Sequence, residues 1–224
     1  MTDPAKPKLT ATLTTPAMLS PHESMRVNQA RGLIAAGQGS PATEPAFVDV
    51  YDLTADCRKP VRKFSGPLGI FGHESAFAPD GKTFYVPGTA APTLTAIDLT
   101  NPAQPSIAWV APGKNFHGMN ISDDGNTLYA ADAGNGRRGL TVLDVTQVQK
   151  RTLNPTVTEI SHLTWPTVSN PQNADPFTRN GHHYLLEIDE YNSRTLNGGA
   201  PYDPTSGRKS NSLNSSHPVI SYAV

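Results

Sequence analysis

The sequence predicts an all-β protein, because it is rich in turn residues, repeats at about 46 residues and lacks long helical periodicity. Its 224 residues include 21 Pro and 18 Gly. This share of turn residues is high, yet it lies below the roughly 25–30% that marks disordered chains. No long segment carries apolar residues at the 3.6-residue spacing of an amphipathic helix. Short β-strands joined by many turns are therefore the expected structure.

Aspartates that end short strand-like segments mark the repeat. Segments 47–54, 94–100 and 140–146 match one another, and 184–189 is a weaker fourth copy. Their aspartates are separated by 46, 46 and 45 residues, and lie at Asp52, Asp98, Asp144 and Asp189. Equal intervals with matching neighbours indicate a structural repeat rather than chance.

Histidines and Asp-Gly pairs keep the same period. His22, His73, His117 and His162 precede those aspartates by 30, 25, 27 and 27 residues. Between them, Asp80-Gly81 and Asp124-Gly125 are typical of β-hairpin turns, since Gly supplies the positive φ. Prolines and another short apolar run follow the aspartate. Each unit thus predicts four short strands, the pattern of a β-propeller blade. A β-sandwich stays open as an alternative, although it would not require this regular period.

The repeat predicts a β-propeller, or part of one, of about four four-stranded antiparallel blades. Within each blade, Ala96, Val142 and their alternating neighbours are expected to be buried, and both Asp-Gly turns exposed. The predicted division is an outer strand of a preceding blade at 1–21, blades at 22–72, 73–116 and 117–161, a divergent blade at 162–204, and an irregular tail with an optional last strand at 205–224.

The start of the chain matches the middle of a repeat. Residues 2–7 resemble 100–105, so segment 9–13 is expected to be the fourth strand of a preceding blade. Two interpretations follow: this strand closes the ring against the last unit, or further blades and an export signal lie upstream. We favour the second. In both cases 9–13 should be an edge strand.

The strands at 94–98 and 140–144 resemble the LVIVD repeat of bacterial β-propeller proteins, and 101–105 fits its usual continuation. The resemblance covers roughly residues 1–192. It implies a bacterial protein and, for a full-length parent, an exported or cell-envelope location. The family is distantly similar to the selenium-binding protein and methanethiol oxidase group, a link that rests on fold-level analogy.

Composition argues against several classes of function. The chain has 18 Lys and Arg against 19 Asp and Glu, a net charge of −1. Nucleic-acid partners need a basic surface, so none is expected. No apolar run reaches the length of a membrane span. The single Cys57 excludes an internal disulfide and a cysteine-rich zinc finger, and no Gly-x-Ser-x-Gly motif indicates a hydrolase.

The register-matched histidines are the candidate site, because the first strand of each blade lines the central channel. Imidazoles and carboxylates that converge from several strands can bind Fe, Cu or Zn. The hypothetical metal ligands are His22, His73, His117 and His162, and the hypothetical ligand-binding residues beside them are Glu23 and Glu74.

A structural role for the histidines is the favoured alternative. WD-repeat blades place a histidine before the first strand and an aspartate at the end of the third, as a hydrogen-bonded pair. Gly72-His73 with Asp98 resembles that arrangement. Each histidine would then be bonded within its own blade. If instead they bind metal, their ring nitrogens must converge.

Two other polar motifs predict no site. The Asp-Gly segments lack the twelve-residue spacing of a calcium loop and are interpreted as turns. His182-His183 with Glu187 and Asp189 is interpreted as solvated strand positions, since residues four apart on a strand lie about 13 Å from each other.

Three functions remain open, with catalytic residues unknown. The first is a scaffold β-propeller that binds a small molecule or a protein at its channel mouth. The second is a metal-dependent, oxidase-like enzyme with the histidine ring as ligands. The third is a non-functional remnant of a longer gene.

Overall fold

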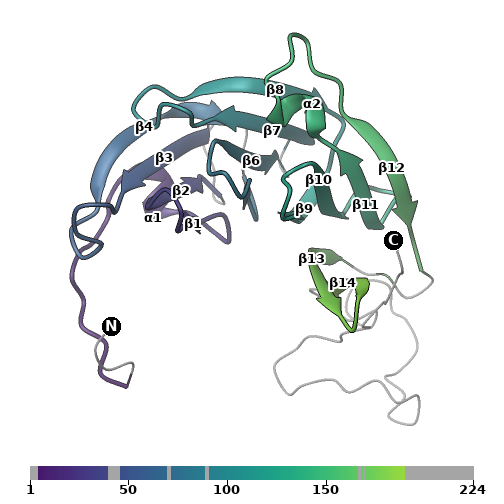
Figure 1. Cartoon of the computed structure of the whole chain (residues 1–224), viewed down its shortest axis with the longest axis horizontal. Helices are drawn as coiled ribbons and strands as arrows, with labels where there is room; N and C mark the ends of the chain where they lie inside the picture. Colours follow the sequence, from purple (N-terminus) through teal and green to yellow (C-terminus); the bar gives the residue numbers. More distant parts are fainter. Residues whose placement is uncertain are drawn as a thin grey trace.

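The computed structural model describes residues 5–39, 46–69, 72–88, 91–165, 168 and 170–189. These residues form an open arc of three four-stranded antiparallel sheets followed by one two-stranded sheet (Figure 1). Two one-turn helices, α1 (Pro16–Leu19) and α2 (Thr146–Gln149), are the only α-helices in these ranges. The predicted all-β blade architecture is confirmed. None of the helices in the described ranges is long and apolar enough to cross a membrane.

Within each sheet the strands lie in chain order. Figure 1 shows the first strands on the concave side of the arc and the fourth strands on the convex side. Blade 1 contains β1 (Arg26–Asn28), β2 (Leu33–Gly37), β3 (Ala46–Asp52) and β4 (Val61–Gly69). Blade 2 contains β5 (Ala76–Phe77), β6 (Thr83–Gly88), β7 (Thr93–Asp98) and β8 (Ser106–Pro112). Blade 3 contains β9 (Phe116–Ile121), β10 (Thr127–Asp132), β11 (Gly139–Asp144) and β12 (Thr158–Leu163), and the last sheet contains β13 (Pro171–Arg179) and β14 (His182–Asp189).

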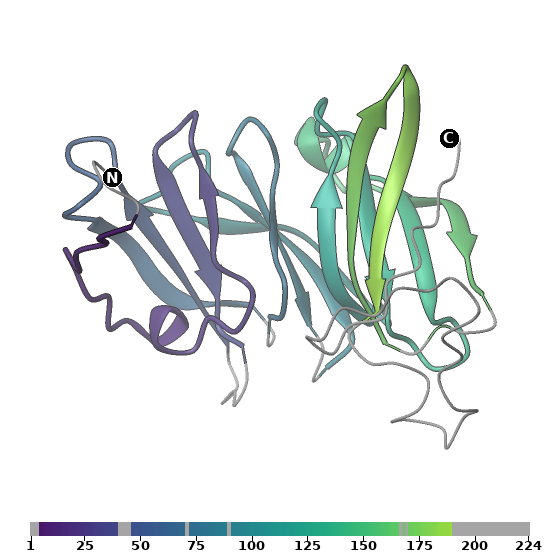
Figure 2. The ribbon, with the colours of Figure 1, turned by 90° about the horizontal axis from the view of Figure 1, so that it is seen from below.

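Apolar clusters between the blades hold the arc together, and Figure 2 shows the sheets standing side by side. Because side chains alternate along a strand, neighbouring residues of β6 face opposite ways. Phe84 packs toward blade 1 with Val48 and Val50, whereas Tyr85 packs toward blade 3 with Met119. Ala96 and Val142 are buried, as predicted.

The repeated aspartates at the ends of the third strands stabilise the turns that follow. Asp52, Asp98 and Asp144 each accept a hydrogen bond from the backbone N–H two residues later, at 2.8, 2.8 and 2.9 Å. That N–H belongs in each case to a threonine. The Asp-x-Thr part of the repeat therefore has a structural explanation, an Asx turn.

The Asp-Gly turns differ in part from the prediction. Asp80 and Asp124 are exposed, but Gly81 and Gly125 are buried. Both glycines have positive φ, +65° and +76°. A Cβ on Gly81 would lie 2.8 Å from the Arg31 Cδ of blade 1, so the turn packs against the preceding blade instead of projecting into solvent.

The fourth unit departs from the predicted register. β12 contains His162 and is the outer strand of blade 3, so the boundary predicted at 161/162 falls inside a strand. Likewise, 184–189 belongs to β14, the second strand of its sheet and not a third strand. The cause is the connection that contains α2: the outer strand begins 8 residues after Asp98 but 14 after Asp144. The rest of the predicted last unit, 190–224, lies outside the described residues.

The N-terminal segment is not the predicted strand. Residues 9–13 form no strand, and Leu9 is 88% exposed. Among the described residues this segment takes part in no strand pairing. Instead α1 covers the outward face of blade 1, where the Met18 N–H donates to the buried Asp49 carboxylate at 3.0 Å.

Candidate metal centre

Three of the four predicted histidines meet where the inner strands of blades 1, 2 and 3 begin. The ring centroids of His22 and His73 lie 4.2 Å apart, and those of His73 and His117 lie 3.9 Å apart. Exposure falls along this row, because His22 is exposed, His73 partly buried and His117 buried. The three blades thus bring residues about 50 positions apart in sequence into contact.

In each blade the residue two positions after the clustered histidine is buried, and it fixes the start of the inner strand. In the last sheet Gln172 takes the place of the histidine. Ser24, Ser75, Met119 and, in the last sheet, Ala174 are all completely buried. Ser24 also donates its hydroxyl to the Gly37 carbonyl on the neighbouring strand. Because these side chains are buried in the core, the histidines and glutamates before them lie at the end of the sheets where the inner strands begin. We call this end the channel end.

Glu23 lies between two of the imidazoles. Its Oε2 is 3.0 Å from Nδ1 of His73 and 3.8 Å from Nδ1 of His22. The shorter approach lacks the alignment of a hydrogen bond, and both of its atoms are buried without one. The other oxygen, Oε1, accepts a hydrogen bond of 3.0 Å from the Gln172 side chain, which orients the carboxylate.

Glu74 occupies the equivalent position in blade 2 and is more deeply buried. Arg26 and Asn173 both donate to its Oε1. Burial nevertheless raises the pKa of Glu74 to about 7, against the lowering effect of Arg26. The group is therefore partly protonated at neutral pH while no cation other than Arg26 is present.

A glycine makes room for this carboxylate. Blade 3 has Gly118 where blades 1 and 2 have Glu23 and Glu74. A Cβ on Gly118 would collide with Glu74 Oε2 and with the Gln172 carbonyl. Because blade 3 has a glycine here instead of a glutamate, the Glu74 side chain can contact blade 3.

The electrostatics of the row keep the central imidazole neutral. Burial, followed by the proximity of His117 and His22, lowers the pKa of His73 to about 3. A neutral imidazole retains a nitrogen lone pair, which is the form that binds metal ions. At neutral pH the His73 ring therefore carries one nitrogen without a proton.

The ligand-type atoms fall into two overlapping sets of three. His22, Glu23 and His73 form the first set, and Glu23, Glu74 and His117 form the second. Within each set, one ligand atom from each residue lies within 4.8 Å of the others. Mixed imidazole and carboxylate ligands suit Zn, Cu and Fe ions.

His162, the fourth predicted ligand, is elsewhere. It lies on β12 opposite Thr141, and its Nδ1 is 2.9 Å from the Thr141 hydroxyl. That hydroxyl donates to the Asp132 carboxylate at 3.0 Å. His162 is thus bonded within its own blade, as the structural alternative predicted. The WD-type pair of His73 and Asp98 does not form, since Asp98 binds the Thr100 N–H and Arg151.

The residues that complete the site were not found from the sequence. Gln172 and Asn173 begin β13 and supply an amide to Glu23 and to Glu74 respectively. Their place in the fourth sheet corresponds to that of the histidine and glutamate in the first two. The only sequence signal is the short Asn-Pro-Gln-Asn segment, which has no histidine to reveal its register.

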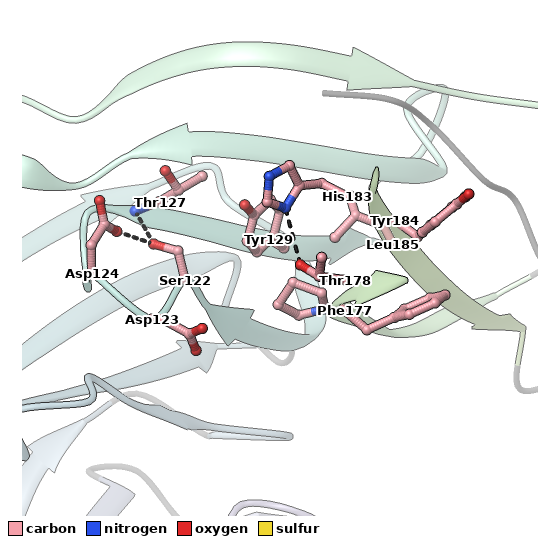
Figure 3. A pocket seen from close by; sticks show the side chains of 11 residues that line it. Ser122, Asp123, Asp124, Thr127, Tyr129, Phe177, Thr178, His183, Tyr184 and Leu185 are labelled. Carbon is pink, nitrogen blue, oxygen red and sulfur yellow. Dashed lines mark hydrogen bonds between the residues drawn. The ribbon is translucent and has the colours of Figure 1, made fainter. Parts of the chain in front are cut away.

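A separate pocket of about 550 Å³ lies at the opposite end of blade 3, beside the β13–β14 hairpin (Figure 3). Asp124 accepts from Ser122 there, and His183 contacts Thr178 at 3.1 Å. His182 and His183 are exposed, in agreement with the prediction of solvated positions.

Glu187 is completely buried, contrary to the expectation of a solvated position. It lies opposite Ala174 across the hairpin, and Ala174 is buried against blade 3. The side chain of Asp189 lies outside the described residues.

Comparisons with known proteins support the fold alone. No protein-family model matches the sequence, and no curated protein is significantly similar to it. A candidate 6-phosphogluconolactonase from Bacteroides uniformis has a TM-score of 0.56 at 20% identity, covering 80% of this chain and 51% of that one. A functionally unknown protein from Desulfotomaculum acetoxidans has a TM-score of 0.56 at 12% identity, and the match covers 81% of this chain and 54% of that one. Hydrazine synthase from Kuenenia stuttgartiensis has a TM-score of 0.53 at 18% identity, and the match covers 80% of this chain and 44% of that one.

These structural neighbours are propeller-like proteins, consistent with the three blades described above. The chain spans about half the length of the solved structures it matches. Their names describe those proteins, and likeness at this identity carries the architecture only.

Proposed function

We propose that the chain is a β-propeller binding module whose channel-end cluster binds a divalent transition-metal ion. The observation that carries the proposal is the convergence of three imidazoles and two glutamates from three blades. Metal sites built in this way use ligands from separate strands, which the fold holds at fixed distances.

The hydrogen bonding of the cluster supports binding over a purely structural role. His73 Nδ1 and Glu23 Oε2 are buried without hydrogen bonds. Such groups cost free energy in the folded chain, about 1–3 kcal/mol each. A bound cation would use both atoms as ligands and offset that cost.

The surrounding residues resemble the support that metal ligands usually have. Metal-bound histidines commonly donate their second nitrogen to a carbonyl or carboxylate, which fixes the ring orientation. His117 Nδ1 lies 3.1 Å from the Gln172 carbonyl. Gln172 also orients Glu23 through its side chain. One residue of β13 therefore holds two of the five candidate ligands.

Titration with Co²⁺ and Zn²⁺ tests the proposal, since Co²⁺ reports its ligand geometry by visible absorption. The wild-type chain, freed of metal with EDTA, should bind both ions. His73→Ala should weaken binding at least tenfold, because it removes a ligand. His162→Ala is the matched control and should bind as the wild type does. Equal affinity in the wild type and His73→Ala would refute the proposal.

Two narrower assignments rest on the sequence. The LVIVD-repeat assignment is supported by β7 and β11, which carry the strands that resemble that motif. The oxidase-like enzyme is not put forward, because no observation on the described residues favours a reaction over binding. The lactonase name of a structural neighbour is likewise not transferred, since 20% identity carries the fold alone.

A further inference from the structure

We infer that the cluster holds two metal ions bridged by Glu23, rather than one ion with five ligands. The inference rests on the proposed function, since it concerns the same residues. It follows from how the ligand atoms are distributed, from the two oxygens of each glutamate and from the charge around them.

The five residues do not form a single ligand set. Ligand atoms that lie within 4.8 Å of one another separate into His22, Glu23 and His73 on one side and Glu23, Glu74 and His117 on the other. Only Glu23 belongs to both. A single ion bound by all five residues would require His22 and His117 to move toward each other. Two ions fit the ligand positions as they are.

The first set already has the spacing of metal ligands. Bonds of roughly 2.0–2.2 Å at tetrahedral angles place neighbouring ligand atoms about 3.4 Å apart. The observed separations from Glu23 Oε2 are 3.0 Å to His73 Nδ1 and 3.8 Å to His22 Nδ1. An ion fits between these three atoms with small adjustments of the side chains.

The second set offers an equivalent place beside blade 3. Arg26 and Asn173 both donate to Oε1 of Glu74, while Oε2 lies over Gly118 and accepts no hydrogen bond within the described ranges. The Glu74 N–H also donates to the His117 carbonyl at 3.1 Å, which ties these two ligands together. Glu74 can therefore keep its donors on one oxygen and bind an ion with the other.

The charge around the cluster favours the binding of cations; three carboxylates and one guanidinium sum to −2, so two divalent ions would also bind an anionic ligand such as hydroxide. Glu23, Glu74 and Asp175 supply three carboxyl groups, and Arg26 is the one guanidinium that acts on Glu74. A carboxylate that binds two ions holds them at roughly 3.5–4 Å, and it screens their mutual repulsion. With three protein ligands each, both ions would retain positions for water or for a shared ligand.

Metal stoichiometry of the dialysed full chain tests this inference. The wild type should hold two Zn²⁺ or Co²⁺ ions per chain. His22→Ala removes a ligand of the first set alone and His117→Ala of the second alone, so each should hold one ion. Glu23→Gln affects both sets and should hold none, while His162→Ala should still hold two.

The outcomes separate the inference from the proposed function. One ion in the wild type, lost equally in His22→Ala and His117→Ala, would establish a single centre and overturn the inference alone. No bound ion in the wild type would overturn both. Because His117 is buried and its variant can misfold, Cu²⁺-loaded wild type provides a second measurement. Spin-coupled paramagnetic resonance at two equivalents of Cu²⁺ is expected, and two isolated Cu²⁺ signals would contradict the bridge.

Discussion

The pKa values of carboxyl groups are shifted in opposite directions at the two ends of the sheets. The turn end carries the Asp-Gly and Asp-x-Thr turns, and the channel end carries the histidine cluster. At the turn end, hydrogen bonds from nearby side chains and backbone N–H groups lower the pKa values of Asp52, Asp124 and Asp144. At the channel end, burial raises the pKa values of Glu74 and Asp175. One end thus stabilises the charged form of its acids, and the other destabilises it.

This contrast separates two repeats that look alike in the sequence. The aspartates and the histidines recur at similar intervals, yet Asp52, Asp98 and Asp144 each accept a hydrogen bond from the turn that follows them in their own blade, and Asp98 is bound by Arg151 of blade 3 as well. The clustered histidines and glutamates contact residues of other blades and leave buried atoms without hydrogen bonds. Groups that weaken a fold locally are typical of binding sites, where a ligand supplies the missing interactions.

The largest expected effect concerns Glu74. Burial raises the pKa of Glu74 from its ordinary value of 4.5 to about 7 in the folded chain, so the contribution of this group to stability is present below pH 4.5 and is lost as the pH rises through 7. At 1.36 kcal/mol per pKa unit, the loss in the free energy of unfolding is about 3 kcal/mol. Denaturant unfolding in EDTA at pH 4.5 and 7.5 measures it.

The variant Glu74→Gln isolates this contribution from that of other titrating groups. It should remove most of the decrease, whereas Glu159→Gln, on the outer strand of blade 3, should leave it unchanged. An identical pH dependence of wild type and Glu74→Gln would show that the channel end does not destabilise its carboxylate.

The second effect concerns the turn end, where Arg151 of blade 3 binds Asp98 of blade 2. Its Nε and Nη2 atoms lie 2.8 and 3.0 Å from the two carboxylate oxygens. Arg151→Ala should lower the free energy of unfolding by about 2 kcal/mol, the magnitude of hydrogen bonds to charged groups. Arg58→Ala, whose ion pair with Asp56 is exposed, is the control and should unfold as the wild type does.

Acid should remove the same interaction. Burial opposes ionisation of Asp98, but hydrogen bonds from Arg151 and Thr100 outweigh it and lower the pKa to about 2. The stabilisation is therefore present above pH 3.8 and is lost as the pH falls through 2. The difference between wild type and Arg151→Ala should shrink between those values, opposite in direction to the effect at Glu74.

A smaller effect is expected for an Asx turn without an arginine partner. Asp144→Ala removes the bond to the Thr146 N–H and should lower the free energy of unfolding by about 0.5–1 kcal/mol. Asp123→Ala is the control, since Asp123 is exposed and has no hydrogen bond within the described ranges. A loss as large as that of Arg151→Ala would mean that the turn, and not the contact between blades, dominates this end.

The smallest effect on stability is expected at the centre of the site. In EDTA, His73→Leu should not lower the free energy of unfolding, because it replaces an imidazole whose buried Nδ1 has no hydrogen bond by an apolar side chain of similar size. In excess Zn²⁺ the wild type should gain more thermal stability than the variant, which keeps the second ligand set alone, since each ion bound to the folded state stabilises it. A large loss in EDTA would instead assign His73 a structural role.

The blades could be predicted from the sequence because their cause is local. Alternating apolar residues, the Asp-Gly turns and the Asp-x-Thr segments each fix nearby backbone, so three four-stranded sheets follow directly. The burial of Gly81 could not be predicted, since it depends on the distance between two blades. Segment 9–13 has the composition of a strand, but strand formation requires a paired neighbour.

The site was predicted in part for the same reason. His22, His73 and His117 share a position set by their own blades. His162 was assigned by interval alone, and the longer connection through α2 moved it onto an outer strand. Gln172 contributes a backbone carbonyl and an amide, groups with no distinctive sequence signal, and its role depends on the packing of β13 beside β9.

Blade 2 accepts hydrogen bonds from arginines of both neighbouring blades, which affects the order in which the blades unfold. Arg31 of blade 1 donates to the Gly81 and Leu99 carbonyls of blade 2, and Arg151 of blade 3 binds the same edge. In a linear array each unit depends on its neighbours, so the end units fray first. Amide hydrogens of β6 and β7 should therefore exchange with solvent deuterium more slowly than those of β2 or β14, with blade 2 as the last cooperative unit to unfold.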